Sequence, residues 1–100
     1  MNLHPVELIT IISLDVLEER LISELKTLGV KGYTISEAHG EGLSQRRDDS
    51  WEGRNIRIEI LASSETTEKV FAHLQKEYFP KYKMIAFNQT VKVLRKEKFL

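Results

Sequence analysis

Isoleucine alternates with charged residues at 56–60, where the chain reads Ile-Arg-Ile-Glu-Ile. Successive side chains of a β-strand point to opposite faces, so this pattern predicts a strand with one apolar and one polar face. Such a strand belongs in a sheet whose apolar face is covered by a second layer. The rest of the chain therefore has to supply further strands and the elements that cover them.

The residues before this strand predict a strand followed by a helix. Residues 6–13 are mostly apolar and β-branched, which is typical of a buried strand. Leucines at three- and four-residue spacing then predict a helix over 15–28. Asp15 and Glu18 have the spacing of a capping box, and Gly29 is typical of a helix C-terminus.

The remaining elements follow from weaker signals. Residues 31–38 alternate weakly and predict a strand before the isoleucine strand. A second helix is predicted between candidate serine caps at 63–64 and a stop at Pro80. Its inner side carries large apolar residues, namely Val70, Phe71, Leu74 and Tyr78. Residues 84–94 predict a final strand that is interrupted near 88–89.

The predicted order is strand, helix, strand, strand, helix, strand. Its simplest packing is an α+β ferredoxin-like sandwich, with a four-stranded antiparallel sheet and both helices on one face. The other face is then uncovered, yet apolar residues occupy both alternation phases of the first strand, at Leu8-Ile9 and Ile11-Ile12. A symmetric oligomer that buries the second face is therefore expected.

Length and composition set broad limits on function. One hundred residues fit a single domain, and 41% hydrophobic with 30% charged residues is ordinary for a globular protein. The net charge of zero provides no general attraction to nucleic acid or to an anionic membrane. The apolar run 6–14 has no preceding Lys or Arg and is too short to span a bilayer. We expect a cytoplasmic protein without a nucleic-acid partner.

The segment 39–55 is polar and contains three of the five glycines, the only tryptophan and an arginine pair. It is too long for an ordinary hairpin turn, and loops of this size are usually functional or disordered. The Gly-x-Gly motif at 40–42 lets backbone N–H groups approach a ligand, and Arg46 and Arg47 follow closely enough to pair with a phosphate. A flexible turn with solvated arginines is equally compatible with these residues.

Other residue types exclude several kinds of chemistry. The chain has no cysteine, and its three histidines, His4, His39 and His73, lack the spacing of metal ligands. No activated nucleophile or spaced acid pair is evident, so we expect neither an enzyme nor a metal site. Trp51, beside Asp48 and Asp49, is either an anchor for a partner protein or a side chain folded over the sheet.

Three stretches of the chain together carry a family resemblance. They are Lys31-Gly32-Tyr33-Thr34 leading into Gly40-Glu41-Gly42 with Arg47, then Asn55-Ile56-Arg57-Ile58-Glu59-Ile60-Leu61, and finally Tyr78-Phe79-Pro80-Lys81-Tyr82 running into Val93-Leu94-Arg95 and Phe99. They cover nearly the whole chain in the same order. On these residues the chain resembles the PII-like signalling proteins, and most closely their SbtB-type subfamily.

The resemblance implies one PII-like domain over 1–100, assembled as a homotrimer. It implies that AMP, cAMP, ADP or ATP binds in clefts between subunits, as an effector and without a cofactor. The loop at about 39–55 corresponds to the family's T-loop, which changes order with the bound nucleotide. In SbtB-type members this loop docks on a bicarbonate transporter. A transporter partner would place the protein peripherally at the inner membrane.

Carried over residue by residue, the resemblance implies two sets of contacts. The positions that match family nucleotide contacts are Gly40, Gly42, Arg47 and the backbone around Met84 and Ile85. The predicted nucleotide-binding set also includes Glu41, Ser44 and Arg46 beside them, and Arg95 of the basic tail. The partner-binding set, which also follows from the chemistry of the loop, is Asp48, Asp49 and Trp51.

This sequence departs from the family pattern in several ways. A second family arginine falls on Ser44, and whether Arg46 replaces it stays open. The loop is several residues shorter than in well-known members, and the cysteine-bearing C-terminal extension of some members is missing. The Thr-Gly-Arg and Gly-Asp-Gly loop of classical nitrogen-sensing PII proteins is also absent. ATP and 2-oxoglutarate sensing of the classical kind is therefore not expected.

Two alternatives remain open on the sequence alone. A CutA-like trimer with a metal-linked or structural role would bind metal through His39 or the acidic loop. An acylphosphatase-type hydrolase would need an Arg-Asn pair, for which Arg47 and Asn55 are the candidates.

Overall fold

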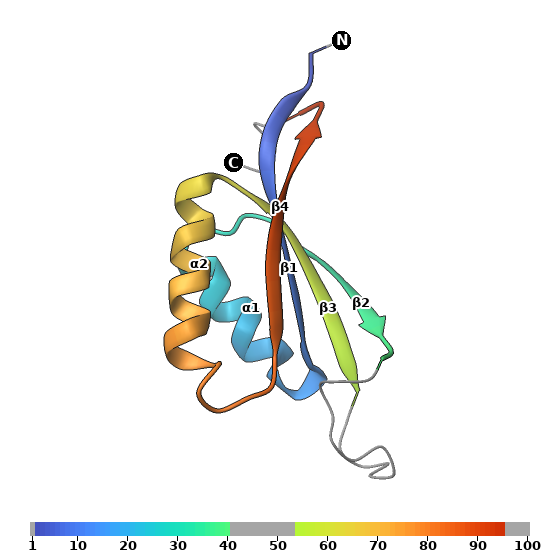
Figure 1. The fold of residues 1–100 in the computed structure, drawn as a ribbon, viewed down its shortest axis with the longest axis vertical. Coiled ribbons are helices and arrows are strands. Elements are labelled where there is room, and N and C mark those ends of the chain that lie inside the picture. Colours follow the sequence, from blue (N-terminus) through green and yellow to red (C-terminus); the bar gives the residue numbers. More distant parts are fainter. Residues whose placement is uncertain (1, 41–53, 96–100) are drawn as a thin grey trace.

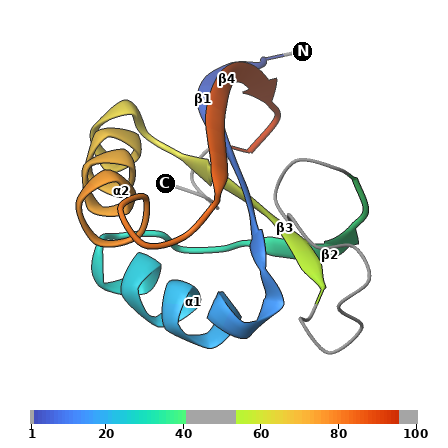
Figure 2. The ribbon, with the colours of Figure 1, turned by 60° about the horizontal axis from the view of Figure 1, so that its bottom comes forward.

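The computed structural model describes residues 2–40 and 54–95. In chain order, its elements are β1 (His4–Leu14), the 3-10 turn η1 (Asp15–Leu17), α1 (Glu18–Thr27), β2 (Thr34–Ala38), β3 (Asn55–Ala62), α2 (Ser64–Glu77) and β4 (Ile85–Val93). The described strands form one antiparallel sheet in the order β2-β3-β1-β4. Both helices cover the same face of this sheet (Figures 1 and 2). The predicted α+β ferredoxin-like fold is confirmed.

The core lies between the two central strands and the helices. Ile9 of β1 is opposite Ile60 of β3, and Ile11 is opposite Ile58, so four isoleucines meet on one face of the sheet. All four are almost completely buried against the leucine stripe of α1 and the inner side of α2. The strand predicted from the isoleucine alternation and both apolar helix stripes are thus confirmed.

The start of the first helix differs from the prediction. Asp15 does not cap it, because the chain passes from β1 into the turn η1 and α1 begins only at Glu18, without a side-chain cap. The backbone N–H of Asp15 instead donates to the carbonyl of Arg54 at 2.7 Å, which ties the turn to the start of β3. The predicted end is confirmed, since Gly29 has a φ of 106°, a conformation that favours glycine.

The second helix begins and ends as predicted. The Ser63 hydroxyl accepts a hydrogen bond from the backbone N–H of Thr66 at 3.1 Å, so Ser63 is the N-cap. The helix ends at Glu77, before Pro80. Tyr78, its C-terminal cap residue, is completely buried.

The last strand is continuous, so the predicted interruption near Asn88 and Gln89 is wrong. These residues pair in register with Ile9 and Leu8 of β1. The side-chain amide of Asn88 donates to the Glu7 carboxylate, and the Thr90 hydroxyl donates to the same carboxylate at 2.7 Å. Their polar side chains are accommodated because β4 is an edge strand and residues 88–90 are exposed.

The sheet face away from the helices, here called the open face, is partly apolar. Its apolar side chains alternate with those of the core and include Leu8, Ile12, Leu61, Ile85 and Phe87. Ile85 and Phe87 are 44% and 45% exposed, which is high for side chains of this size. Two-sided apolar character, inferred above from the first strand, is therefore present in three strands of the sheet.

Replacing Ile58 by alanine should lower the free energy of unfolding by about 3 kcal/mol, because it empties space at the centre of the core. Val16→Ala is the control, because Val16 is 72% exposed and its truncation should change stability by less than about 0.5 kcal/mol. Denaturant unfolding measures both. Equal stability losses for the two variants would contradict the assigned core.

Candidate functional site

Four strand ends lie together at one end of the sheet. Ala38, which ends β2, is opposite Asn55, which starts β3, and Asn55 is in turn opposite Leu14 at the end of β1. On the other side of β1, Ile12 is opposite Ile85 at the start of β4. Figure 1 shows these ends together at the bottom of the molecule. Residues 41–53 are therefore attached at the end of the sheet where β4 begins.

Gly40 is the predicted site residue that the structure describes on the β2 side. It is exposed, and a Cβ added to it would meet nothing within 4 Å. Packing therefore does not require glycine at this position, whereas close approach of a ligand to the backbone would benefit from it. The other predicted residues of the loop lie outside the described residues: Glu41, Gly42, Ser44, Arg46, Arg47, Asp48, Asp49 and Trp51.

Met84 and Ile85 are the predicted residues on the β4 side. Met84 is half-buried and packs against the core, while the Ile85 side chain lies on the open face. Met84 is the last residue of the connection between Tyr78, at the C-terminus of α2, and β4, and Ile85 is the first residue of β4. This stretch, residues 79–84, is here called the α2–β4 connection.

The two sides of the predicted site lie on opposite edges of the sheet. β2 and β4 are the edge strands, separated by β3 and β1. At a spacing of about 4.8 Å per strand, the edges are about 14 Å apart. One phosphate group cannot contact both Gly40 and Ile85 of the same chain over this distance. These residues can share a ligand where the β2 edge of one copy faces the β4 edge of another.

Arg95 lies away from both sides. Arg95 follows the C-terminal end of β4. Because β4 is nine residues long, its C-terminal end is about 27 Å from Ile85, at its start. Figure 1 shows this end of β4 at the top of the molecule. Within one chain the structure therefore does not bring Arg95 together with Met84 and Ile85.

Sequence reasoning missed three cationic residues near these strand ends. Lys81 and Lys83 are exposed on the α2–β4 connection. Arg54, which precedes β3, is also exposed and has its guanidinium 3.5 Å from the Glu37 carboxylate. The alternating Lys-Tyr-Lys of 81–83, next to the predicted contact at Met84, was the signal available in the sequence.

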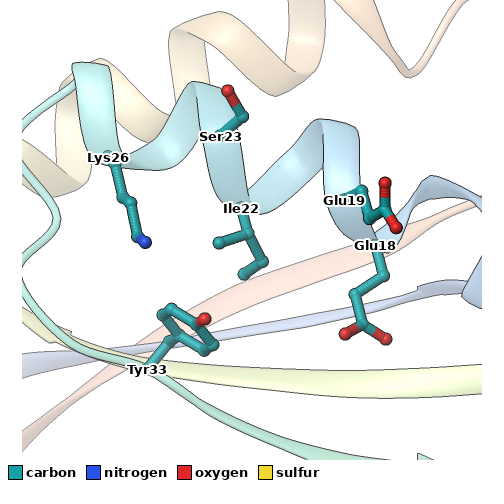
Figure 3. Close-up of a pocket in the computed structure, with 6 residues that line it drawn as sticks. All are labelled: Glu18, Glu19, Ile22, Ser23, Lys26 and Tyr33. Atoms are coloured by element: carbon teal, nitrogen blue, oxygen red, sulfur yellow. The ribbon is translucent and has the colours of Figure 1, made fainter.

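Among the hollows on the described part of the surface are two that differ in position and lining. The larger, of about 370 Å³, lies between α1 and Tyr33 and is lined by Glu18, Glu19, Ile22, Ser23, Lys26 and Tyr33 (Figure 3). Lys26 extends toward the Tyr33 ring, with Nζ 5.9 Å from its centroid. Carboxylates and an ammonium are mixed along this hollow, and none of the predicted nucleotide contacts lines it.

The second hollow lies beside the start of β4. It has a volume of about 300 Å³ and is lined by Gln75 and by the apolar residues Phe71, Leu74, Phe79 and Ala86. Because Ala86 directly follows Ile85, this apolar space adjoins the β4 side of the predicted site.

A polar cluster joins the two helices behind this hollow. The Glu24 carboxylate of α1 accepts hydrogen bonds from the Tyr78 hydroxyl and from His73 Nε2, each at 2.7 Å, and from Arg20 Nε at 3.1 Å. Burial opposes the charged form of Glu24, but the hydrogen bonds outweigh it and lower the pKa of this carboxyl from 4.5 to about 2. Burial, and then the bond to Glu24, raises the pKa of Tyr78 well above its usual value.

Stability should fall in acid because of Glu24. Its pKa is lowered on folding, so its contribution is complete above the unfolded value of 4.5 and disappears as the pH falls toward 2. The free energy of unfolding should fall by about 1–2 kcal/mol over this window. The loss is limited because 31% of the Glu24 side chain is exposed, and solvent weakens the interactions of its charge. Denaturant unfolding between pH 2 and 7 measures it.

The matched variants for this prediction are Glu24→Gln and Glu68→Gln. The first should flatten the acid side of the stability profile, and the second, on the exposed side of α2, should leave it unchanged. An unaltered profile for Glu24→Gln would contradict the assigned role of the cluster.

Neither described helix is long and apolar enough to cross a membrane. Within residues 2–40 and 54–95, no group of three His, Cys, Asp or Glu residues is arranged to hold a metal ion. The acidic part of the loop, on which the CutA-like alternative depends, lies outside these ranges.

Comparisons with known proteins bear on the same site. The sequence model of one family, described as nitrogen regulatory protein P-II, matches residues 6–98. A PII-like signalling protein from Thermus thermophilus is 47% identical over the whole of both chains, with a TM-score of 0.87. None of the curated proteins matches this chain.

Two further structures are of CPII, from Thiomonas intermedia. The complex with ADP, AMP and acetate is 26% identical, covers 99% of this chain and 98% of that one, and has a TM-score of 0.86. The complex with ADP and bicarbonate is 25% identical with the same coverage and a TM-score of 0.85. These matches favour the PII-like hypothesis over the CutA-like and acylphosphatase-type alternatives.

Proposed function

The chain belongs to the nitrogen regulatory protein P-II family, and we propose that it binds adenine nucleotides as effectors and signals their presence to a partner protein. The observation that carries this proposal is the position of Gly40 and of Met84 with Ile85, which lie at one end of the sheet but on opposite edges. A ligand held between two copies would contact both. CPII, which has the same fold, binds ADP and AMP.

The nucleotide phosphate would lie at the loop base. Backbone N–H groups around Gly40 to Gly42 and the guanidinium of Arg47 would bind it, with Arg46 or Ser44 beside them. Lys81 and Lys83 add positive charge from the other side of the cleft, next to Met84 and Ile85. Arg95 can reach such a cleft only from a different copy than the one that supplies Met84, because it lies at the far end of β4.

The assembly that completes such clefts is a homotrimer. A head-to-tail contact between the β2 edge of one copy and the β4 edge of the next closes into a ring when the rotation permits. The open faces of the sheets then turn toward the axis of the ring, where their exposed apolar side chains are buried. This arrangement gives each cleft one side from each of two copies.

Signalling would use the segment 39–55 as the output. Phosphate binding at its base favours one conformation of the loop over others, and a partner that prefers that conformation then binds more tightly. Asp48, Asp49 and Trp51 supply charge and an aromatic anchor for that partner. On the SbtB-type resemblance, the partner is a membrane transporter, such as one for bicarbonate, and the protein is cytoplasmic or peripheral at the inner membrane.

In this proposal the protein is not an enzyme and has no cofactor. The nucleotide acts as an effector, bound and released without reaction, and residues 1–100 form one domain. Chemistry is not required because the effect of the ligand is a difference in its affinity for two states of the loop.

Isothermal titration calorimetry with AMP, cAMP, ADP and ATP tests the proposal. At least one of the four should bind, with one site per chain if each cleft of a ring is equivalent. Absence of binding by all four, in a sample whose trimer is intact, would refute the sensor function.

Arg47→Ala should weaken nucleotide binding by about 1.5–3 kcal/mol, the usual value of a hydrogen bond to a charged group. Lys69→Ala is the control, because it removes one positive charge from the exposed side of α2, away from the cleft. Calorimetry on both variants separates a specific phosphate contact from a general effect of charge. Equal weakening by the two substitutions would rule the specific contact out.

Phe87→Glu should convert the trimer into monomers, because it places a charge on the apolar open face. Val16→Glu places the same charge at an exposed site on η1 and should leave the trimer intact. Light scattering coupled to size-exclusion chromatography gives the mass of each. A trimeric Phe87→Glu variant would exclude burial of the open face.

A further inference from the structure

We propose that the hydrogen bond between Tyr78 and Glu24 is a positioning contact for the nucleotide site, acting through the α2–β4 connection. The inference rests on the proposed function, since it assigns a role in nucleotide affinity. Neither residue lies at the loop base or in the predicted nucleotide contacts. Both act from within the helix layer.

The Tyr78 side chain is fixed on several sides. Among residues 2–40 and 54–95 it is the largest fully buried side chain, and its hydroxyl donates to Glu24 Oε1 at 2.7 Å. The same oxygen accepts from His73 Nε2, while Arg20 bonds the other carboxylate oxygen. The Arg20 guanidinium also lies over the Tyr78 ring, 4.5 Å from its centroid. Rotation of this ring would leave its hydroxyl buried without a partner, which is unfavourable.

The backbone of Tyr78 is where the α2–β4 connection begins. Its carbonyl accepts hydrogen bonds from the backbone N–H groups of Lys81 and Tyr82, each at 2.9 Å. The Tyr82 ring packs against the Tyr78 ring, with 6.0 Å between their centroids. Tyr78 thus supplies both the buried ring and the carbonyl that binds the first turn of the connection. A shift of the ring therefore moves the start of the connection.

The rest of the connection follows from this anchor. Tyr82 and Met84 are half-buried against the core, whereas Phe79, Lys81 and Lys83 are exposed. Along the connection, side chains that pack against the core therefore alternate with side chains that are exposed to solvent. The position of the Met84 and Ile85 backbone therefore depends on these inward contacts and on Tyr78, whose hydroxyl is held by Glu24. Packing networks of this kind change ligand affinity by a few-fold to tens of fold.

A purely structural role is the competing explanation, because the cluster also joins α1 to α2. The chain offers a matched control for it at the other end of the same helix. Ser63 caps α2 through Thr66 and makes no contact with the connection. Ser63→Ala destabilises the protein through the loss of a helix cap, without altering the anchor at Tyr78.

The experiment compares Tyr78→Phe, Glu24→Gln and Ser63→Ala with the unmodified trimer. ADP affinity is measured by calorimetry well below each unfolding midpoint, and hydrogen exchange is followed for the amides of 81–85. Tyr78→Phe and Glu24→Gln should weaken ADP binding by about five-fold or more and speed exchange in this segment. Ser63→Ala should keep ADP affinity within about two-fold and leave the exchange of 81–85 unchanged.

Unchanged ADP affinity in folded Tyr78→Phe would overturn the inference, as would an equal loss of affinity in Ser63→Ala. If Tyr78→Phe does not fold, Glu24→Gln decides, because it replaces the charged acceptor of the Tyr78 hydroxyl by a neutral, weaker one. Unchanged ADP affinity in folded Glu24→Gln would then overturn the inference. Failure of the proposed function is distinguishable, because then the unmodified protein itself binds no adenine nucleotide.

Discussion

Burial of one isoleucine face by two helices is the constraint on which the other features of this protein depend. Ile9 and Ile11 meet Ile58 and Ile60 in the middle of the sheet, and the helices seal that contact from one side only. Because 100 residues supply just two helices within the described ranges, the opposite face keeps its apolar side chains in contact with solvent. Within the described ranges, no further strand pairs with β2 or β4, so both edges of the sheet are also unpaired. Association of several copies is the remedy that such a small chain has available.

Much of the fold followed from local patterns in the sequence. Alternation identified β3, leucine spacing identified α1, and Ser63 and Gly29 marked helix ends correctly. Asp15 failed as a cap because a tertiary bond to the Arg54 carbonyl, invisible in the sequence, draws the chain into a 3-10 turn. Asn88 and Gln89 likewise predicted a break in β4, but both residues pair with β1 and the strand is continuous. Local signals determine element type, whereas element ends depend on partners far along the chain.

The candidate site was less accessible to sequence reasoning. Gly40 and Met84 were predicted as nucleotide contacts through resemblance, but only the strand order shows that they lie on opposite edges of the sheet. Lys81 and Lys83 gained significance when their exposure next to Met84 became visible. The Glu24 cluster could not be anticipated, because His73 and Tyr78 lie 49 and 54 residues from Glu24 in sequence. Periodicity placed Tyr78 on the inner side of the second helix, but it gives no signal for the partner of the Tyr78 hydroxyl.

The proposed division of the nucleotide site between the two sheet edges would have a genetic consequence. In a ring, a chain damaged at the loop base still offers an intact β4 side, and a chain damaged at the α2–β4 connection still offers an intact loop. When both kinds of chain are made in one cell, some neighbouring pairs combine the two undamaged halves and regain a complete cleft. Two inactive alleles would thus complement each other. Conversely, one defective allele would impair clefts that its normal neighbours share.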